Sequence, residues 1–165
     1  MSAREQGVQA DLYSLIPRTA IFLRDGDAFL LLRGSSSKRI WPGRYNGVGG
    51  HVDRGEDVLT AAQRELREET GLEANLRLCG TVVVDSGPVG IGLYVFSGSI
   101  TGGQLRESSE GKAEWIPYDQ IQSLPSVSDV PQLVARIRQM KEGDPPFAAR
   151  SHYGEDGHLQ LEFAD

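Results

Sequence analysis

Three glutamates stand close together in one short charged stretch of this sequence: Glu65, Glu68 and Glu69. Residues three and four positions apart are neighbours on one face of a helix, with about 5–6 Å between their Cβ atoms. Like charges at this spacing repel one another and destabilise an isolated helix. A divalent cation reverses that penalty, because Mg²⁺ takes hard oxygen ligands together with substrate phosphates. The spacing indicates a metal site, and a solvated helix face is the alternative interpretation.

The residues around these acids predict the helix that would position them. Leu59, Ala62 and Leu66 recur at helical spacing and would form an apolar stripe against a core. Gly71 follows the last turn and predicts the end of the helix. The three acids then fall on the face beside the apolar stripe.

The acids belong to a longer pattern of glycines, acids and one arginine. Its fixed positions are Gly50, Glu56, Arg64, Glu65, Glu68, Glu69 and Gly71. This pattern matches the Nudix box at every specified position, so the chain resembles the Nudix hydrolase family. The resemblance implies an α/β fold, namely the Nudix-type α/β/α sandwich with a mixed β-sheet.

The resemblance also implies a metal-dependent site that uses Mg²⁺ or Mn²⁺ to cleave a phosphoanhydride. By position, Glu65, Glu68 and Glu69 would be metal ligands, with the backbone carbonyl of Gly49 completing the metal shell. Bound metal neutralises phosphate charge and lowers the pKa of coordinated water, and a nearby carboxylate can accept the proton. Glu65 or Glu68 is the expected general base.

Two other acids have separate expected roles. Glu56 would pair with Arg64 and hold the preceding loop against the helix. Members of the family often take a further metal-binding acid from a loop outside the box, and Glu110 is the candidate here. A polar loop exposed to water is the alternative for the segment around Glu110.

The glycine-rich segment 43–50 reads GRYNGVGG. It is similar to the GRWNGFGG of the MutT-like branch, which hydrolyses oxidised purine nucleoside triphosphates. The resemblance implies that Asn46 contacts the base, since one amide can donate and accept in the plane of a purine. Vertebrate members carry a Trp and two acids where this chain has only Asp129. Tyr45 or Trp41 would stack on the base or, alternatively, belong to the core.

Other functions stay open. One is an ADP-ribose or nucleotide-sugar pyrophosphatase, for which Pro88 stands near the expected position. Another is a catalytically silent Nudix domain that senses a nucleotide and regulates a partner. A diphosphate isomerase would need a catalytic Cys, and Cys79 lies in an apolar strand pattern that suits a buried thiol.

Length, net charge and cysteine content limit the domain number, the partners and the cellular location that we expect. The 165 residues predict one domain, 1–165, with residues 1–17 as an N-terminal extension. A net charge of −6 argues against a nucleic-acid partner, and no apolar run is long enough to cross a membrane. Cys79 is the only cysteine, which fits a reducing, cytoplasmic location. We expect a monomer or homodimer acting on a small nucleotide.

Alternation and turn residues predict the remaining elements. A turn is expected at 101–103, a single helical turn within 118–124 and an amphipathic helix at 130–140. The expected strands are 18–24, 28–33, 76–84, 90–96, 113–117, 147–153 and 159–163.

Overall fold

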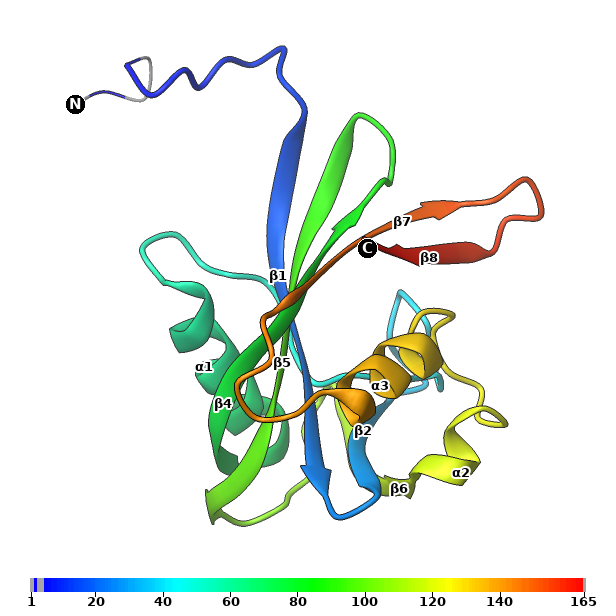
Figure 1. The fold of residues 1–165 in the computed structure, drawn as a ribbon. Helices are drawn as coiled ribbons and strands as arrows, with labels where there is room; N and C mark the ends of the chain where they lie inside the picture. Colours follow the sequence, from blue (N-terminus) through cyan, green and yellow to red (C-terminus); the bar gives the residue numbers. More distant parts are fainter. Residues whose placement is uncertain (1, 3–4, 165) are drawn as a thin grey trace.

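The structure, a computed structural model, describes residues 2 and 5–164. An eight-stranded sheet lies between helix α1 on one side and helices α2 and α3 on the other (Figure 1). The helices are α1 (Val58–Thr70), α2 (Tyr118–Ile121) and α3 (Val130–Gln139). The strands are β1 (Ser14–Asp25), β2 (Ala28–Gly34), β3 (Tyr45–Asn46), β4 (Leu72–Val84), β5 (Val89–Gly103), β6 (Gly111–Pro117), β7 (Phe147–Tyr153) and β8 (Leu159–Phe163).

The sheet is mixed, as expected. Its strand order is β3-β2-β1-β5-β4-β7-β8, and β6 pairs with β2. The β1–β5 and β4–β7 pairs are parallel, whereas the other pairs are antiparallel. The predicted α/β/α sandwich is confirmed.

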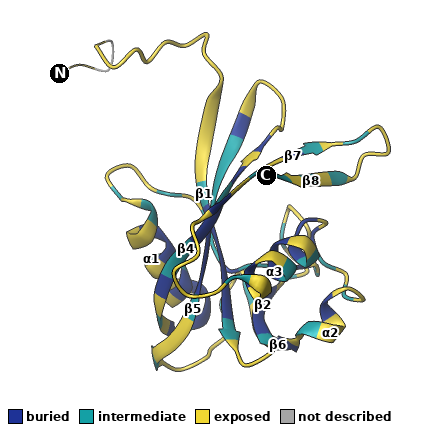
Figure 2. Cartoon of the chain, viewed as in Figure 1, coloured by how far each residue is buried: buried dark blue, intermediate teal, exposed yellow. Residues whose placement is uncertain are grey.

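The alternation of side chains along a strand builds a core on each face of the sheet. Ile21 and Leu23 of β1 belong to the cluster that contains Leu66 of α1. Phe22, between them, belongs to the cluster that contains Leu133 of α3. Figure 2 shows the buried residues gathered on the strands between the helices. Burial on both faces fixes the register of β1 and so the position of everything attached to it.

Helix α1 has well-defined ends. The Asp57 carboxylate accepts hydrogen bonds from the N–H groups of Leu59 and Thr60 at 2.9 Å, and Gly71 ends the helix with φ 76°. The predicted stop at Gly71 is confirmed. The predicted stripe was wrong at its first position, because Leu59 is 39% exposed. The buried face is turned toward Glu69 instead.

Several element boundaries differ from the predictions, most of all at the end of β5 and the start of β1. The expected turn at 101–103 is the end of β5, where Gly103 pairs with Leu72. A Cβ on Gly103 would lie 2.2 Å from the Gly71 carbonyl oxygen, so glycine permits this close pairing. The expected extension also ends earlier than Pro17, because β1 begins at Ser14 and pairs with β5 from that residue.

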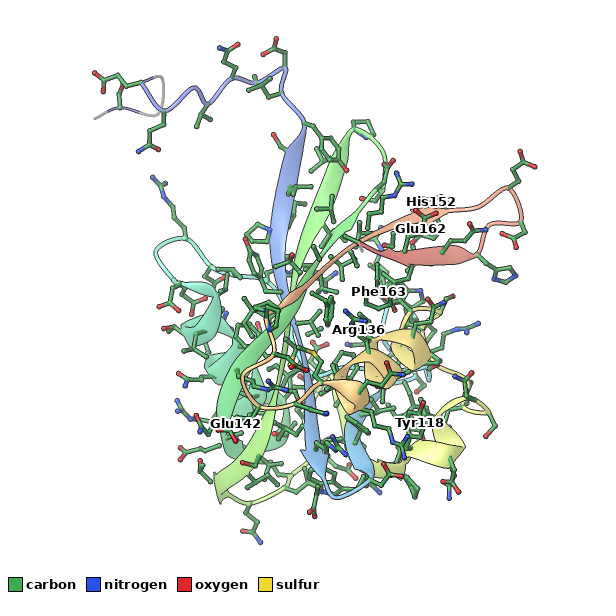
Figure 3. The ribbon with its side chains drawn as sticks, viewed as in Figure 1. Tyr118, Arg136, Glu142, His152, Glu162 and Phe163 are labelled. Carbon is green, nitrogen blue, oxygen red and sulfur yellow. The ribbon has the colours of Figure 1, made fainter. Side chains whose placement is uncertain are left out.

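The last two strands form the predicted hairpin and lie over α3. The guanidinium of Arg136 in α3 stands 5.4 Å from the ring centre of Phe163 in β8, and both side chains are labelled in Figure 3. Phe147 of β7 meets the same ring edge-on at 5.2 Å. These contacts attach the hairpin to the helical layer. None of the helices in residues 2 and 5–164 is long and apolar enough to span a membrane.

The two leucines of α1 offer a stability test. Leu66 is 1% exposed and Leu59 is 39% exposed. We expect Leu66→Ala to lower the free energy of unfolding by about 2–5 kcal/mol, because it leaves a cavity between α1 and the sheet. Leu59→Ala, the control on the same helix, should cost less than about 1 kcal/mol. Urea denaturation measures both, and equal losses would contradict this packing of α1.

Candidate active site

The segment that follows Asn46 runs along β1 and is held to it by backbone hydrogen bonds. The Thr19 N–H donates to the Gly50 carbonyl at 2.8 Å, and the Ile21 N–H donates to the Val48 carbonyl at 2.6 Å. These bonds lie where β2 has separated from β1, since those two strands pair only near their hairpin. The glycine pair is therefore fixed against a central strand.

A side chain on Gly49 would meet the β1 backbone, and one on Gly50 would displace the Glu65 carboxylate. Gly49 has φ 152°, and a Cβ there would lie 2.1 Å from the Thr19 carbonyl oxygen. A Cβ on Gly50 would lie 2.5 Å from Oε1 of Glu65. The two glycines let the β1 backbone and a carboxylate of α1 approach the same segment closely.

Glu69 is the buried acid of α1. It is 5% exposed, and its Oε2 accepts a hydrogen bond from the Gly49 N–H at 3.2 Å. Burial raises the pKa of this carboxyl to about 7, and the nearby charges of Glu65 and Glu110 act in the same direction. The Gly49 N–H and the Lys38 ammonium oppose that shift. The fold thus holds a carboxyl where its ionised form is costly.

Arg64 connects the loop to the other two acids of the helix. Its Nε and one terminal nitrogen bind the two oxygens of Glu56 at 2.7 and 2.9 Å, and this hydrogen-bonded pair lowers the pKa of Glu56 to about 2. The other terminal nitrogen donates to Glu65 at 2.9 Å and to Glu68 at 3.3 Å. Arg64 therefore ties the loop to α1 and compensates the repulsion between two of its carboxylates.

The three acids of α1, Glu65, Glu68 and Glu69, share one cavity of about 530 Å³, which we call the acidic cavity. Glu110 comes into it from the loop before β6 and pairs there with Lys38 at 2.8 Å. The structure thus brings the expected loop acid beside the box acids. The cavity is lined by Arg18, Lys38, Gly49, Gly50, His51, Asp53, Glu65, Glu68, Glu69, Ser108, Ser109 and Glu110.

The chemistry of this donor set suits a hard divalent cation. Carboxylates and a backbone carbonyl are oxygen ligands of the kind that Mg²⁺ and Mn²⁺ prefer. Among the described residues, no three acid, histidine or cysteine side chains already converge on one point. Two of the acids instead share the cation of Arg64. The buried Glu69, with one hydrogen bond from the described residues, is the acid that a cation would benefit most.

A second, largely hydrophobic cavity of about 110 Å³ opens beside the first, and we call it the apolar cavity. Its walls come from the sheet, from α3 and from the β7–β8 hairpin. Asn46 and Asp129 are among its polar lining residues. Asp129 is 8% exposed, and burial raises the pKa of its carboxyl. The Asn46 amide oxygen accepts a hydrogen bond from the Gly47 N–H at 2.7 Å, which orients the amide.

A third cavity, of about 430 Å³, is lined by four cations, Arg18, Lys38, Arg39 and Arg44, and we call it the basic cavity. It shares Trp41, Asn46 and Gly47 with the apolar cavity, and Lys38, Ser109 and Glu110 with the acidic cavity. The three cavities are therefore contiguous, and their linings differ sharply in charge.

Comparison with known proteins identifies this arrangement, because the NUDIX domain family model matches residues 15–137. The chain belongs to the NUDIX family. The acidic helix of this NUDIX domain and the glycine segment beside it both fall within the matched residues. The expected family is confirmed.

Named relatives of this NUDIX domain act on nucleotides. It is 34% identical over 94 residues to the oxidized purine nucleoside triphosphate hydrolase of Mus musculus, which covers 55% of this chain and 60% of the relative. It is 30% identical over 128 residues to the 8-oxo-dGDP phosphatase NUDT18 of Homo sapiens, covering 74% of this chain and 38% of the relative. The chain thus spans less than two thirds of either relative.

A solved structure agrees with this NUDIX fold along most of the chain. The crystal structure of a mutator MutT protein from Bacillus halodurans superposes with a TM-score of 0.75 and 26% identity. The match covers 90% of this chain and 97% of the other. The agreement extends past residue 137 and so includes part of the C-terminal segment.

Tyr45 and Trp41, the two aromatic residues considered for stacking on the base, lie in different surroundings. Tyr45 is buried, and its hydroxyl donates to Oε2 of Glu114 at 2.6 Å. It lines none of the three cavities, which places it in the core, the alternative considered above. Trp41 is 40% exposed and lines both the apolar and the basic cavity.

Sequence reasoning missed Arg18 and Lys38. Arg18 opens the first predicted strand and Lys38 lies in a loop rich in Gly and Ser, so neither stands out by spacing. Arg18 reaches the cavities because β1 runs beside residues 48–51, which are distant from it in the sequence. The Lys38–Glu110 pair likewise joins residues 72 positions apart.

The raised pKa of Glu69 predicts a pH dependence of stability. Its value in the folded protein is about 7 against an ordinary value of 4.5, so the folded state holds this proton more tightly than the unfolded chain. In chelator, the free energy of unfolding should therefore fall by up to about 3 kcal/mol from this group as pH rises from 4.5 to 7. Glu69→Gln should remove that part of the slope.

Urea denaturation of both proteins in EDTA at pH 5 and pH 7.5 measures the difference. Glu73→Gln, on an exposed residue of β4 outside the acidic cavity, is the matched control and should keep the slope of the unaltered protein. Identical slopes for the unaltered protein and Glu69→Gln would contradict the burial of a costly carboxylate.

Proposed function

We propose that this chain is a divalent-metal-dependent pyrophosphohydrolase that converts a purine nucleoside triphosphate, including oxidised forms, into the monophosphate and pyrophosphate. The supporting observation is the continuity of the acidic and apolar cavities, which share Arg18 and Gly49. A nucleotide has one flat, largely apolar end and one highly charged end. The two cavities match those ends.

The polar groups of the apolar cavity suit a purine edge. The Asn46 amide can donate and accept in the plane of a base. Burial keeps the Asp129 carboxyl protonated to a higher pH than usual, and a neutral carboxyl can donate as well as accept. The names of the mouse and human relatives support an oxidised purine.

The acidic cavity would perform the hydrolysis. Glu69 would be the principal metal ligand, assisted by Glu65, Glu68, Glu110 and the Gly49 carbonyl. Bound Mg²⁺ or Mn²⁺ supplies charge neutralisation for the phosphates and a lowered pKa for water. Glu65 or Glu68 then accepts the proton of the water that adds across the P–O–P bond. The reaction consumes one water molecule and breaks one anhydride linkage.

The direct test is product analysis with Mg²⁺ across nucleoside triphosphates, oxidised purine triphosphates, nucleoside diphosphates, ADP-ribose and dinucleoside polyphosphates. We expect monophosphate and pyrophosphate from purine triphosphates, and no turnover in EDTA. Release of orthophosphate from nucleoside diphosphates, or preferred cleavage of ADP-ribose, would contradict the substrate assignment. No turnover of any compound would favour the silent sensor. A cytoplasmic location and the oligomeric state stay predictions.

Substitutions in the acidic cavity should separate catalysis from folding. Glu65→Gln and Glu68→Gln should lower kcat by about 10²–10⁴-fold for whichever residue is the base. Glu69→Gln should lower activity more than about 100-fold at moderate Mg²⁺, because a ligand is lost. Glu73→Gln is again the control and should retain activity. Full activity of Glu69→Gln would exclude the proposed metal role.

Asn46→Ala tests how the base is recognised. Removing the amide leaves the base edge without its partner, so discrimination between purine and pyrimidine triphosphates should fall about 10-fold in kcat/KM. Hydrolysis of a pyrimidine triphosphate should change much less. An equal loss of kcat/KM on every nucleotide would show that Asn46 maintains the conformation of the glycine segment and does not recognise the base.

A further inference from the structure

One charged side chain touches all three cavities. Arg18 lines the acidic, apolar and basic cavities, and Gly49 is the other residue that does so. Lys38 and Glu110 line the acidic and basic cavities without reaching the apolar one. Arg18 therefore marks the place where the apolar cavity meets the acidic cavity.

The backbone of Arg18 is fixed on both sides. It pairs with Leu93 of β5 and forms an isolated bridge with His51 of the box segment. The side chain is half-buried and belongs to a central strand of the sheet. The strand therefore fixes the point from which the guanidinium reaches into the cavities.

The charge of Arg18 is not compensated by a carboxylate of the described residues. Lys38 has Glu110 at 2.8 Å, whereas none of the ion pairs among residues 2 and 5–164 involves Arg18. Asp129 is the only other charged residue of the apolar cavity, and burial favours its neutral form. A half-buried guanidinium without a carboxylate partner among these residues can take an external anion as its counter-charge.

A nucleotide that spans the two cavities must place one particular group at their junction. With the base in the apolar cavity and the terminal phosphates among the acids, the sugar and the phosphate attached to it lie at the junction, and this phosphate is the anionic group there. We propose that the guanidinium of Arg18 binds this α-phosphate. Arginine suits the role because its planar fork can donate two parallel hydrogen bonds to phosphate oxygens.

The proposal rests on the proposed function for the direction in which the nucleotide lies. It adds a residue that would recognise the nucleoside end of the phosphate chain without metal. The monophosphate product keeps the α-phosphate, whereas a nucleoside lacks it. Binding of these two ligands in EDTA therefore isolates the contribution of Arg18 from that of the acids.

The test is the affinity for a purine nucleoside monophosphate and for the matching nucleoside, measured by calorimetry in EDTA. Arg18→Gln should weaken monophosphate binding by about 10–100-fold, the range expected for a charge-assisted hydrogen bond. Nucleoside affinity should stay within about twofold, and Arg18→Lys should recover part of the loss. Arg54→Gln removes the same charge from an exposed residue that lines none of the three cavities and is the matched control.

The outcomes distinguish this proposal from the proposed function. Monophosphate affinity unchanged in Arg18→Gln, or a monophosphate that binds the unaltered protein no better than the nucleoside, would overturn the role of Arg18 even in an active hydrolase. Equal losses for nucleoside and monophosphate would also overturn it, because a structural effect would be the cause. An Arg18-dependent monophosphate site in a protein without hydrolase activity would leave the binding site intact and reject the enzyme.

Discussion

The site depends on one electrostatic constraint, which is that a carboxylate is held out of water beside other carboxylates. Glu69 is almost fully buried and receives one hydrogen bond, from Gly49, among the described residues. Acids outnumber cations among the residues that line the same cavity, so ionisation of this buried carboxyl is costly. The neighbouring elements either bury this carboxyl or offset the repulsion among the acids around it.

The glycine pair and Arg64 hold the acids of α1 in their positions. The glycine pair is hydrogen-bonded to β1, and its missing side chains let α1 approach that strand. Arg64 then holds Glu56 and bridges to Glu65 and Glu68, which stabilises the exposed side of the acid cluster. Glu69 gains nothing directly from Arg64, so its charge is the one left for an external cation. Arg64 thus offsets the repulsion between Glu65 and Glu68, whereas Glu69 lacks that compensation.

The acidic and apolar cavities differ in their linings, so a bound ligand would have a preferred orientation. Acids line one end, hydrophobic groups with Asn46 and Asp129 line the other, and Arg18 stands between them. A ligand that is charged throughout, or apolar throughout, would complement only one of the two cavities. A nucleotide would match both ends, which supports the proposed class of substrate over inorganic polyphosphate.

The sequence predicted the local features of this site well because spacing alone determines them. Helical periodicity and Gly71 located α1, and alternation located most strands. The position of Tyr45 could not be decided, because β3 has only two residues and so shows no alternation. Leu59 was placed in the core although the buried face of α1 is turned toward Glu69. Arg18 and Lys38 reach the site through long-range pairing, which no local pattern in the sequence encodes.

The most direct measurement is anomalous diffraction from crystals grown with Mn²⁺ and a non-hydrolysable purine nucleoside triphosphate. The account predicts a Mn²⁺ peak in the acidic cavity within coordination distance of Glu69, with the phosphates beside it and the base in the apolar cavity. A nucleotide bound there without any Mn²⁺ peak near Glu69, at a Mn²⁺ concentration that saturates turnover, would contradict the central claim that this buried carboxylate exists to hold a cation.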